Sequence, residues 1–91
     1  MLFYNMAKAK KTKSIESDFD VFLQKVGARM RDLRTKKGFS NYEHFAYEHN
    51  IGRSQYGKYE QGKDDLRLSS LYKIITSFDL TFEEFFGEGF D

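Results

Sequence analysis

Apolar residues recur at intervals of three and four along most of this sequence, and that spacing is the feature that most constrains the fold. The longest unbroken series is Phe19, Leu23, Val26, Met30 and Leu33. Steps of three and four return a side chain to one face of an α-helix, whereas a strand needs alternation, which no segment of the sequence shows. The chain has 91 residues and no proline. We therefore expect an all-α fold in a single compact domain.

Capping residues and glycines predict where the first helices begin and end. The first helix is expected over about residues 18–37, because Gly38 can end it in the left-handed conformation. Gly27, inside this helix, is expected to mark the close approach of another helix. Ser40 and Glu43 form a capping box that opens a second helix, which runs to about residue 49.

Three further helices are expected after the second. The third is expected over about residues 53–61, and a glycine follows it. An apolar stripe indicates the fourth, and it consists of Leu71, Ile74, Ile75 and Phe78. A second capping box, at Thr81 and Glu84, opens a short fifth helix. The expected architecture is therefore a compact five-helix domain.

The N-terminal residues differ from the rest of the chain. Four lysines lie between positions 8 and 13, where the sequence has no apolar period. We expect a flexible, disordered basic arm over residues 1–16, followed by the folded domain over residues 17–91. Such an arm can add contacts to phosphates, and a merely solvated tail is the alternative.

Charge is unevenly distributed, although the net charge is only +1. Residues 1–40 carry ten Lys and Arg against four Asp and Glu, whereas residues 41–91 carry five against ten. One end of the molecule can therefore attract a polyanion that the other end repels, unless these are ordinary solvated faces. The absence of cysteine excludes disulfides and thiolate zinc sites and fits a cytoplasmic location. No apolar run approaches the roughly 18 residues of a membrane span.

Residues 41–61 carry the clearest functional indication. Two short capped helices are joined there by about three residues, which is the plan of a helix-turn-helix motif whose second helix enters the major groove of DNA. At about 100° per residue, the second of these helices turns Tyr56 and Tyr59 to one side and a polar set to the other. The polar set comprises Arg53, Ser54, Gly57, Lys58 and Gln61.

This polar side has the chemistry that base recognition needs. Arg53 can pair with guanine through two hydrogen bonds, and Lys58 can donate to guanine or to phosphate. Ser54 can read either type of base, and Gly57 is expected to let the backbone approach the DNA. An ordinary amphipathic surface helix would show the same pattern, so the preceding helix and turn are what favour DNA binding.

Glu60 lies on the other side of the same helix, near its C-terminus. The helix dipole disfavours a carboxylate at that end, so a cationic partner is expected. Arg34, at the end of the first helix, is the candidate. The alternative is that Glu60 is simply solvated.

Several runs of the sequence resemble the Cro/repressor (Xre-type) helix-turn-helix family. They lie at residues 26–34, 45–46, 51–56, 58–63 and 71–86, so the resemblance covers roughly residues 24–87. The run Tyr-Glu-Gln-Gly-Lys at residues 59–63 is the most specific of them. The resemblance implies a lambda-repressor-like DNA-binding domain.

The resemblance also implies roles for individual residues. Arg34 and Glu60 match a pair that forms a structural salt bridge in the family. Positions that contact bases are matched by Arg53, Ser54 and Lys58. Positions that contact phosphates are matched by Asn41, Tyr42, Gln61 and Lys63. Tyr42 stands where the family usually has Gln, which is a departure from the pattern.

These observations predict a regulator of transcription that binds double-stranded DNA in a sequence-specific way and acts as a repressor. A homodimer is expected, with Phe85, Phe86 and Phe90 as its candidate interface, unless these rings complete a thin core. The alternative function is a protein-interaction module, such as an antitoxin or an adaptor, which the acidic C-terminal third favours.

No pattern in the sequence points to catalysis. There is no set of Ser, His and Asp with supporting glycine turns, and there is no phosphate-binding loop. His44 and His49 are five residues apart and do not share a helix face, so no metal site is expected. We expect neither an enzyme nor a cofactor.

Overall fold

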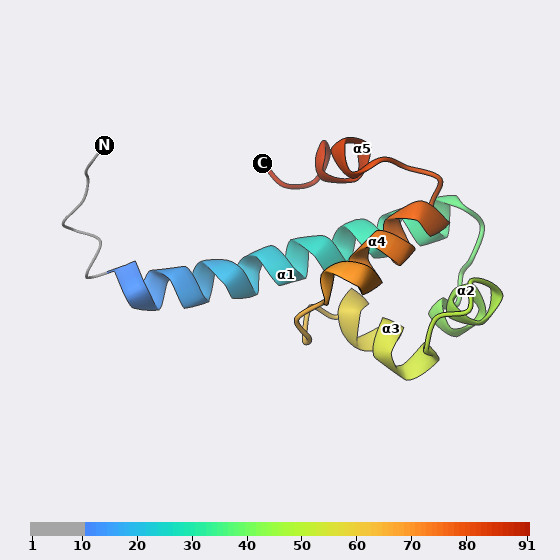
Figure 1. Cartoon of the computed structure of the whole chain (residues 1–91), viewed down its shortest axis with the longest axis horizontal. Helices are drawn as coiled ribbons and strands as arrows, with labels where there is room; N and C mark the ends of the chain where they lie inside the picture. The colour runs from blue at the N-terminus through green and yellow to red at the C-terminus, as the bar shows by residue number, and fades with distance from the viewer. Residues whose placement is uncertain (1–10) are drawn as a thin grey trace.

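The structure is a computed structural model that describes residues 11–91, with side chains from residue 15 onward. The described residues form five α-helices and no strand, which confirms the expected all-α fold. The helices are α1 (Lys11–Lys36), α2 (Tyr42–Glu48), α3 (Arg53–Glu60), α4 (Leu68–Ser77) and α5 (Phe82–Phe86), as Figure 1 shows. Within this part of the chain, no helix is both long and apolar enough to cross a bilayer.

The helix α1 is much longer than the others, and it begins at Lys11 rather than near residue 18. Residues 11–16, which were expected to belong to the flexible arm, continue this helix. Neither glycine nor proline interrupts them, and adding a turn to an existing helix is far less costly than starting one. The remainder of the predicted arm, residues 1–10, lies outside the described residues.

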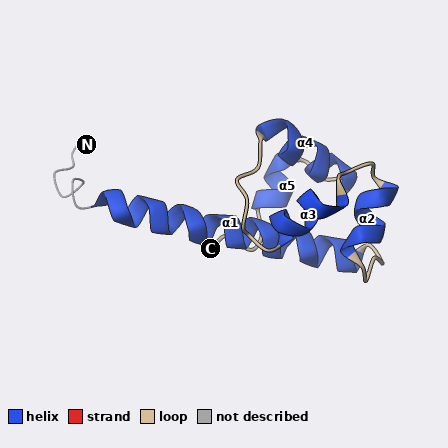
Figure 2. Ribbon diagram, turned by 90° about the horizontal axis from the view of Figure 1, so that it is seen from below, coloured by secondary structure: helices blue, strands red, loops and turns tan. Residues whose placement is uncertain are grey.

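The other four helices gather against the C-terminal part of α1, while its N-terminal part extends beyond them (Figure 2). The core lies among the gathered helices, and every helix contributes to it. Its largest fully buried side chains are those of Met30, Phe45, Tyr56, Ile74, Ile75 and Phe85. The ring of Phe45 lies 5.3 Å from that of Tyr56 and 5.0 Å from that of Phe78, between centroids. Truncating a ring in such a setting typically costs about 3–5 kcal/mol, so Phe45 is a main support of the motif.

The helix α2 has a different N-cap from the one expected. Asn41 caps it, because its Oδ1 accepts hydrogen bonds from the backbone N–H groups of Glu43 at 2.7 Å and His44 at 3.2 Å. Ser40 was expected in this role. Serine and asparagine are comparable N-caps, so when the two are adjacent the sequence cannot tell at which of two positions the helix begins.

The predicted close approach at Gly27 is confirmed, and the helix that approaches is α3. A Cβ atom at Gly27 would lie 2.6 Å from the carbonyl oxygen of Tyr59. Only glycine allows two backbones to come this close. The contact holds the side of α3 that carries Tyr59 against α1 and turns the opposite side outward.

The C-terminal segment adds one more layer over α1. The capping box of α5 is present, with Thr81 Oγ1 accepting from the backbone N–H of Glu84 at 3.1 Å. Arg29 of α1 then donates to the carbonyl oxygens of Phe85 at 2.8 Å and Glu84 at 2.9 Å. One cation thus satisfies carbonyl groups that the short helix leaves without partners.

The interface expected at the three C-terminal phenylalanines needs a correction. Phe85 is fully buried and belongs to the core, so it is not available to a second protein chain. Phe86 and Phe90 are half-buried beside it. Phe85 and Phe86 are adjacent in α5 and so point in different directions, and only the Phe85 ring is fully enclosed by the core.

Candidate nucleic-acid interface

The two sides of α3 have opposite environments. Tyr56 and Tyr59 are buried, with 0% and 5% of their surfaces exposed. The side chains of Arg53, Ser54 and Lys58 are all exposed. Neither of the two cations forms an ion pair with a described residue. The helix therefore presents two uncommitted cations and a hydroxyl group to solvent.

The residues expected to contact phosphates lie at the two ends of the motif. Asn41 is exposed at the start of α2. Gln61 is the C-cap of α3, and both it and Lys63 are exposed. Tyr42 is half-buried, unlike the other three. The three exposed donors thus lie at the start of α2 and at the end of α3.

Gly57 does not have the role that the sequence suggested. It is buried, and a Cβ atom there would lie 2.6 Å from the ring of Tyr42. The glycine therefore accommodates the ring of α2 instead of leaving the backbone open to DNA. The helical-wheel angle placed Gly57 on the polar side, but a bulky neighbour from the preceding helix covers it.

Arg34 and Glu60 lie together as a buried ion pair. Arg34 Nε and Nη2 donate to the two carboxylate oxygens of Glu60 at 2.7 and 3.0 Å, and both residues are about 95% buried, with exposures of 6% and 5%. Arg34 Nη1 also donates to the carbonyl oxygen of Phe39 at 2.7 Å, just before α2. The hydrogen bond to Glu60 raises the pKa of Arg34. A single guanidinium group therefore joins the ends of α1 and α3 and the approach to α2.

A second polar group lies beside this pair. The Tyr56 hydroxyl is buried and has no hydrogen-bond partner of good geometry among residues 11–91. Burial, followed by the neighbouring Glu60 carboxylate, raises the pKa of Tyr56 far above its ordinary value. This tyrosine therefore stays neutral under the α3 surface.

Gln55 is an exposed residue of α3 that the sequence patterns did not single out. Its Nε2 donates to Asp64 Oδ2 at 2.8 Å, which ties α3 to the loop that follows it. The two residues are nine positions apart and no periodicity links them, so spacing alone could not reveal the contact.

The short helices α2 and α3 are joined by a tight turn, and α3 packs on the long helix α1. This arrangement defines a small, all-α helix-turn-helix protein. A solved structure, the restriction-modification controller protein C.AhdI from Aeromonas hydrophila, matches this fold with a TM-score of 0.65 and 35% sequence identity. The match covers 72% of this chain and 98% of that protein. The chain belongs to the Cro/C1-type (Xre-type) helix-turn-helix family of transcription regulators, as the resemblance implied. No family model matches the chain, and no curated protein does.

Proposed function

We propose that this protein is a sequence-specific regulator of transcription that inserts α3 into the major groove of double-stranded DNA and acts as a repressor. The observation that carries the proposal is the outward display of Arg53, Ser54 and Lys58 over a buried pair of tyrosines. Membership of a family of transcription regulators supports it. A cytoplasmic location of the protein agrees with its cysteine-free composition.

In this proposal, base contacts and phosphate contacts have separate roles. Arg53, Ser54 and Lys58 read base edges, and Asn41 and Lys63 are among the groups that hold the helix in register through phosphates. The side-chain Oδ1 of Asn41 already caps α2, so its side-chain Nδ2 is the group left to donate to a phosphate. Tyr42 and Gln61 complete the phosphate set, Tyr42 through its hydroxyl group.

A titration of Arg53→Ala tests the proposal. A duplex selected from a random library by the parent protein serves as the operator, and fluorescence anisotropy compares it with unrelated DNA. The variant should lose about 1–3 kcal/mol of discrimination between the two duplexes, or roughly 5- to 150-fold. A control variant, Lys36→Ala, changes an exposed cation that pairs with Asp32 on α1. An unchanged ratio for Arg53→Ala would show that α3 does not read the bases.

Lys63→Ala distinguishes phosphate contacts from base contacts. It should weaken binding to both duplexes by a similar factor and lower the slope of the salt dependence by about one unit. A sequence-dependent loss would contradict the role proposed for Lys63.

The second candidate is a protein-interaction module, such as an antitoxin or an adaptor, on the same fold. Exposed apolar side chains on α4 and α5 favour it, including Leu68, Tyr72 and Phe82. Binding through several phosphates must weaken steeply as salt rises, whereas an apolar protein interface does not. Absence of any salt-dependent DNA binding would favour this second function.

We also propose that two copies of the chain bind as a homodimer, so that each copy serves one half-site. Phe86 and Phe90 are the members of the predicted interface that remain partly exposed.

A further inference from the structure

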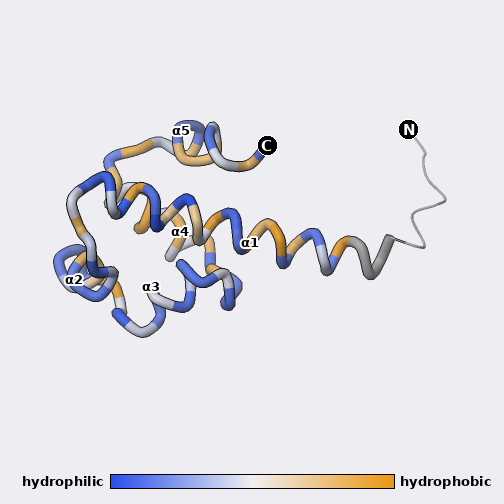
Figure 3. The backbone as a smooth tube through the Cα atoms, turned by 180° about the vertical axis from the view of Figure 1, so that it is seen from behind, coloured by the Kyte–Doolittle hydropathy of each residue, from blue (hydrophilic) through white to orange (hydrophobic). Residues whose placement is uncertain are grey.

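The N-terminal half of α1 displays an apolar face that the rest of the described chain leaves partly uncovered. Ile15, Phe19 and Phe22 lie on it, with 63%, 41% and 41% of their surfaces exposed. Figure 3 shows apolar segments of α1 continuing outward beyond the packed helices. The steps of four and three between these residues continue to Val26, which is the spacing of a helix that packs along another helix.

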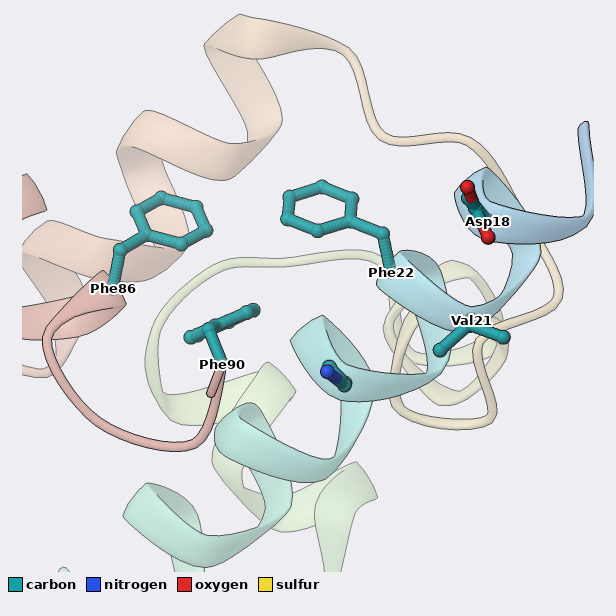
Figure 4. A pocket seen from close by; sticks show the side chains of 6 residues that line it. Asp18, Val21, Phe22, Phe86 and Phe90 are labelled. Atoms are coloured by element: carbon teal, nitrogen blue, oxygen red, sulfur yellow. The ribbon is translucent and has the colours of Figure 1, made fainter. Parts of the chain in front are cut away.

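A groove runs along this part of α1, and aromatic rings form its walls. Its volume is about 340 Å³, and it is lined by Asp18, Val21, Phe22, Lys25, Phe86 and Phe90. The Phe22 ring lies 6.2 Å from Phe86 and 5.8 Å from Phe90, between centroids, so the rings of α1 and of the C-terminal segment form one surface. Figure 4 shows Phe22 and Phe86 facing each other across the groove, with Phe90 beneath them.

Two opposite charges line this groove. Asp18 and Lys25 are seven residues apart on the same face of α1, which places them about 10 Å apart along the helix axis. The only hydrogen bond that the Lys25 side chain makes with a described residue is a long one, 3.4 Å, from Nζ to the main-chain oxygen of Asp91. Asp18 forms no ion pair with a described residue.

From this arrangement we infer that the groove is occupied by α1 of a second copy of the chain, running antiparallel. An antiparallel copy places its Lys25 beside Asp18 and its Asp18 beside Lys25, so both pairs form at once. A parallel copy would place like charges together. In the same antiparallel register, Phe22 of each copy lies opposite Val21 of the other, and Ile15 is covered by the segment around residue 28 of the other copy.

The inference specifies the contact surface of the proposed homodimer. It rests on the proposed function only in requiring two copies of the chain. Phe86 and Phe90, already proposed for the interface, form one wall of the groove. DNA is not required for this contact, so the test contains none. Failure here therefore leaves the reading of DNA by α3 untouched, and failure of the Arg53 titration leaves the groove untouched.

Charge reversal in sedimentation equilibrium provides the test. The parent chain should be a dimer, whereas Asp18→Lys and Lys25→Glu should each weaken self-association at least tenfold, because each brings like charges together. An equimolar mixture of the two variants should restore the dimer, since each Lys then faces an acidic residue of the other chain. Asp20→Lys is the matched control, because this exposed acidic residue of α1 does not line the groove. Circular dichroism verifies that all four proteins are folded.

Every outcome of this test either supports or overturns the antiparallel contact between the two copies of α1. Weakened single variants, a restored mixture and an unchanged control support the antiparallel contact. A monomeric parent, unchanged single variants, or a mixture that does not associate would overturn it. Ile15→Ser provides an independent readout, with at least a tenfold loss of self-association expected and an unchanged dissociation constant counting against the inference.

Discussion

The two halves of α1 carry the same apolar spacing but have opposite surroundings. In the C-terminal half, Val26 and Met30 have 2% and 0% of their surfaces exposed, because α2, α3 and the segment around α5 pack on them. In the N-terminal half, Ile15 and Phe19 keep 63% and 41% exposed. A helical apolar stripe therefore shows which face of a helix will be covered, and not which chain will cover it.

The charged groups of the two halves of α1 also differ in their surroundings. In the C-terminal half, Arg34 is buried and holds the carboxylate of Glu60 through two hydrogen bonds. In the N-terminal half, Asp18 and Lys25 line an open groove. A buried pair is costly to disrupt because its remaining member keeps an uncompensated charge, whereas a charge in an open groove can be changed at little cost to folding.

The largest effect is therefore expected in the C-terminal half, from Glu60→Gln. This change leaves the Arg34 guanidinium buried without a counter-charge and should lower the free energy of unfolding by about 3–5 kcal/mol. Urea denaturation followed by circular dichroism measures it. Glu48→Gln, on an exposed carboxylate of α2, should change stability by less than about 0.5 kcal/mol. Equal effects of the two substitutions would show that the buried carboxylate is no more important to stability than the exposed one.

Gly27→Ala is expected to have the next largest effect. The added Cβ would meet the main-chain oxygen of Tyr59 at 2.6 Å, and neither backbone can move without shifting a helix. The free energy of unfolding should fall by about 1–3 kcal/mol, despite the better helix propensity of alanine. Ala28→Ser, at the exposed neighbouring position, is the control. Similar melting temperatures for the two variants would contradict the close crossing of α1 and α3.

The pH dependence of stability should show a smaller effect of the same buried cluster. Burial and Glu60 raise the pKa of Tyr56, so the folded chain keeps this proton when the unfolded chain loses it near its ordinary pKa of 10.0. This contribution is fully present below pH 10 and is lost as the pH rises above it, by about 1.4 kcal/mol per pH unit. Urea titrations at about pH 9 and pH 11 measure the loss. Tyr56→Phe should reduce it, and an identical loss in this variant would show that other groups are responsible.

The smallest effect is expected in the N-terminal half, from Ile15→Ser at a protein concentration where the chain is monomeric. The side chain is mostly exposed there, so the free energy of unfolding should change by less than about 0.5 kcal/mol. Val26→Ser, on the same stripe but buried, should cost several times more. Comparable losses at the two positions would show that the two halves do not differ in a single chain.

Periodicity and capping chemistry were enough to predict the five helices and the orientation of α3. Each residue of an α-helix is rotated by about 100° from the one before it, and a helix of eight residues hardly departs from that geometry. This rotation turns Tyr56 and Tyr59 toward the core and Arg53 toward solvent. The partnership of Arg34 with Glu60 was also accessible, since a carboxylate at the C-terminal end of a helix needs a cation.

Three other features were beyond the reach of these patterns. The start of α1 at Lys11 is one example, because polar residues continue a helix without any apolar signal. The burial of Phe85 is another, since three nearby phenylalanines are equivalent until the fold selects one for the core. The cover over Gly57 is a third, because it depends on a ring from a different helix.

The contact between Tyr42 and Gly57 has a consequence for how this motif can change over evolutionary time. With the ring in place, any larger residue at position 57 would push α2 away from α3, because its Cβ would meet the ring at 2.6 Å. A smaller side chain at position 42 would remove that restriction. The two positions are therefore coupled in inheritance, and related proteins with a small residue at position 42 are the ones expected to tolerate a side chain at position 57.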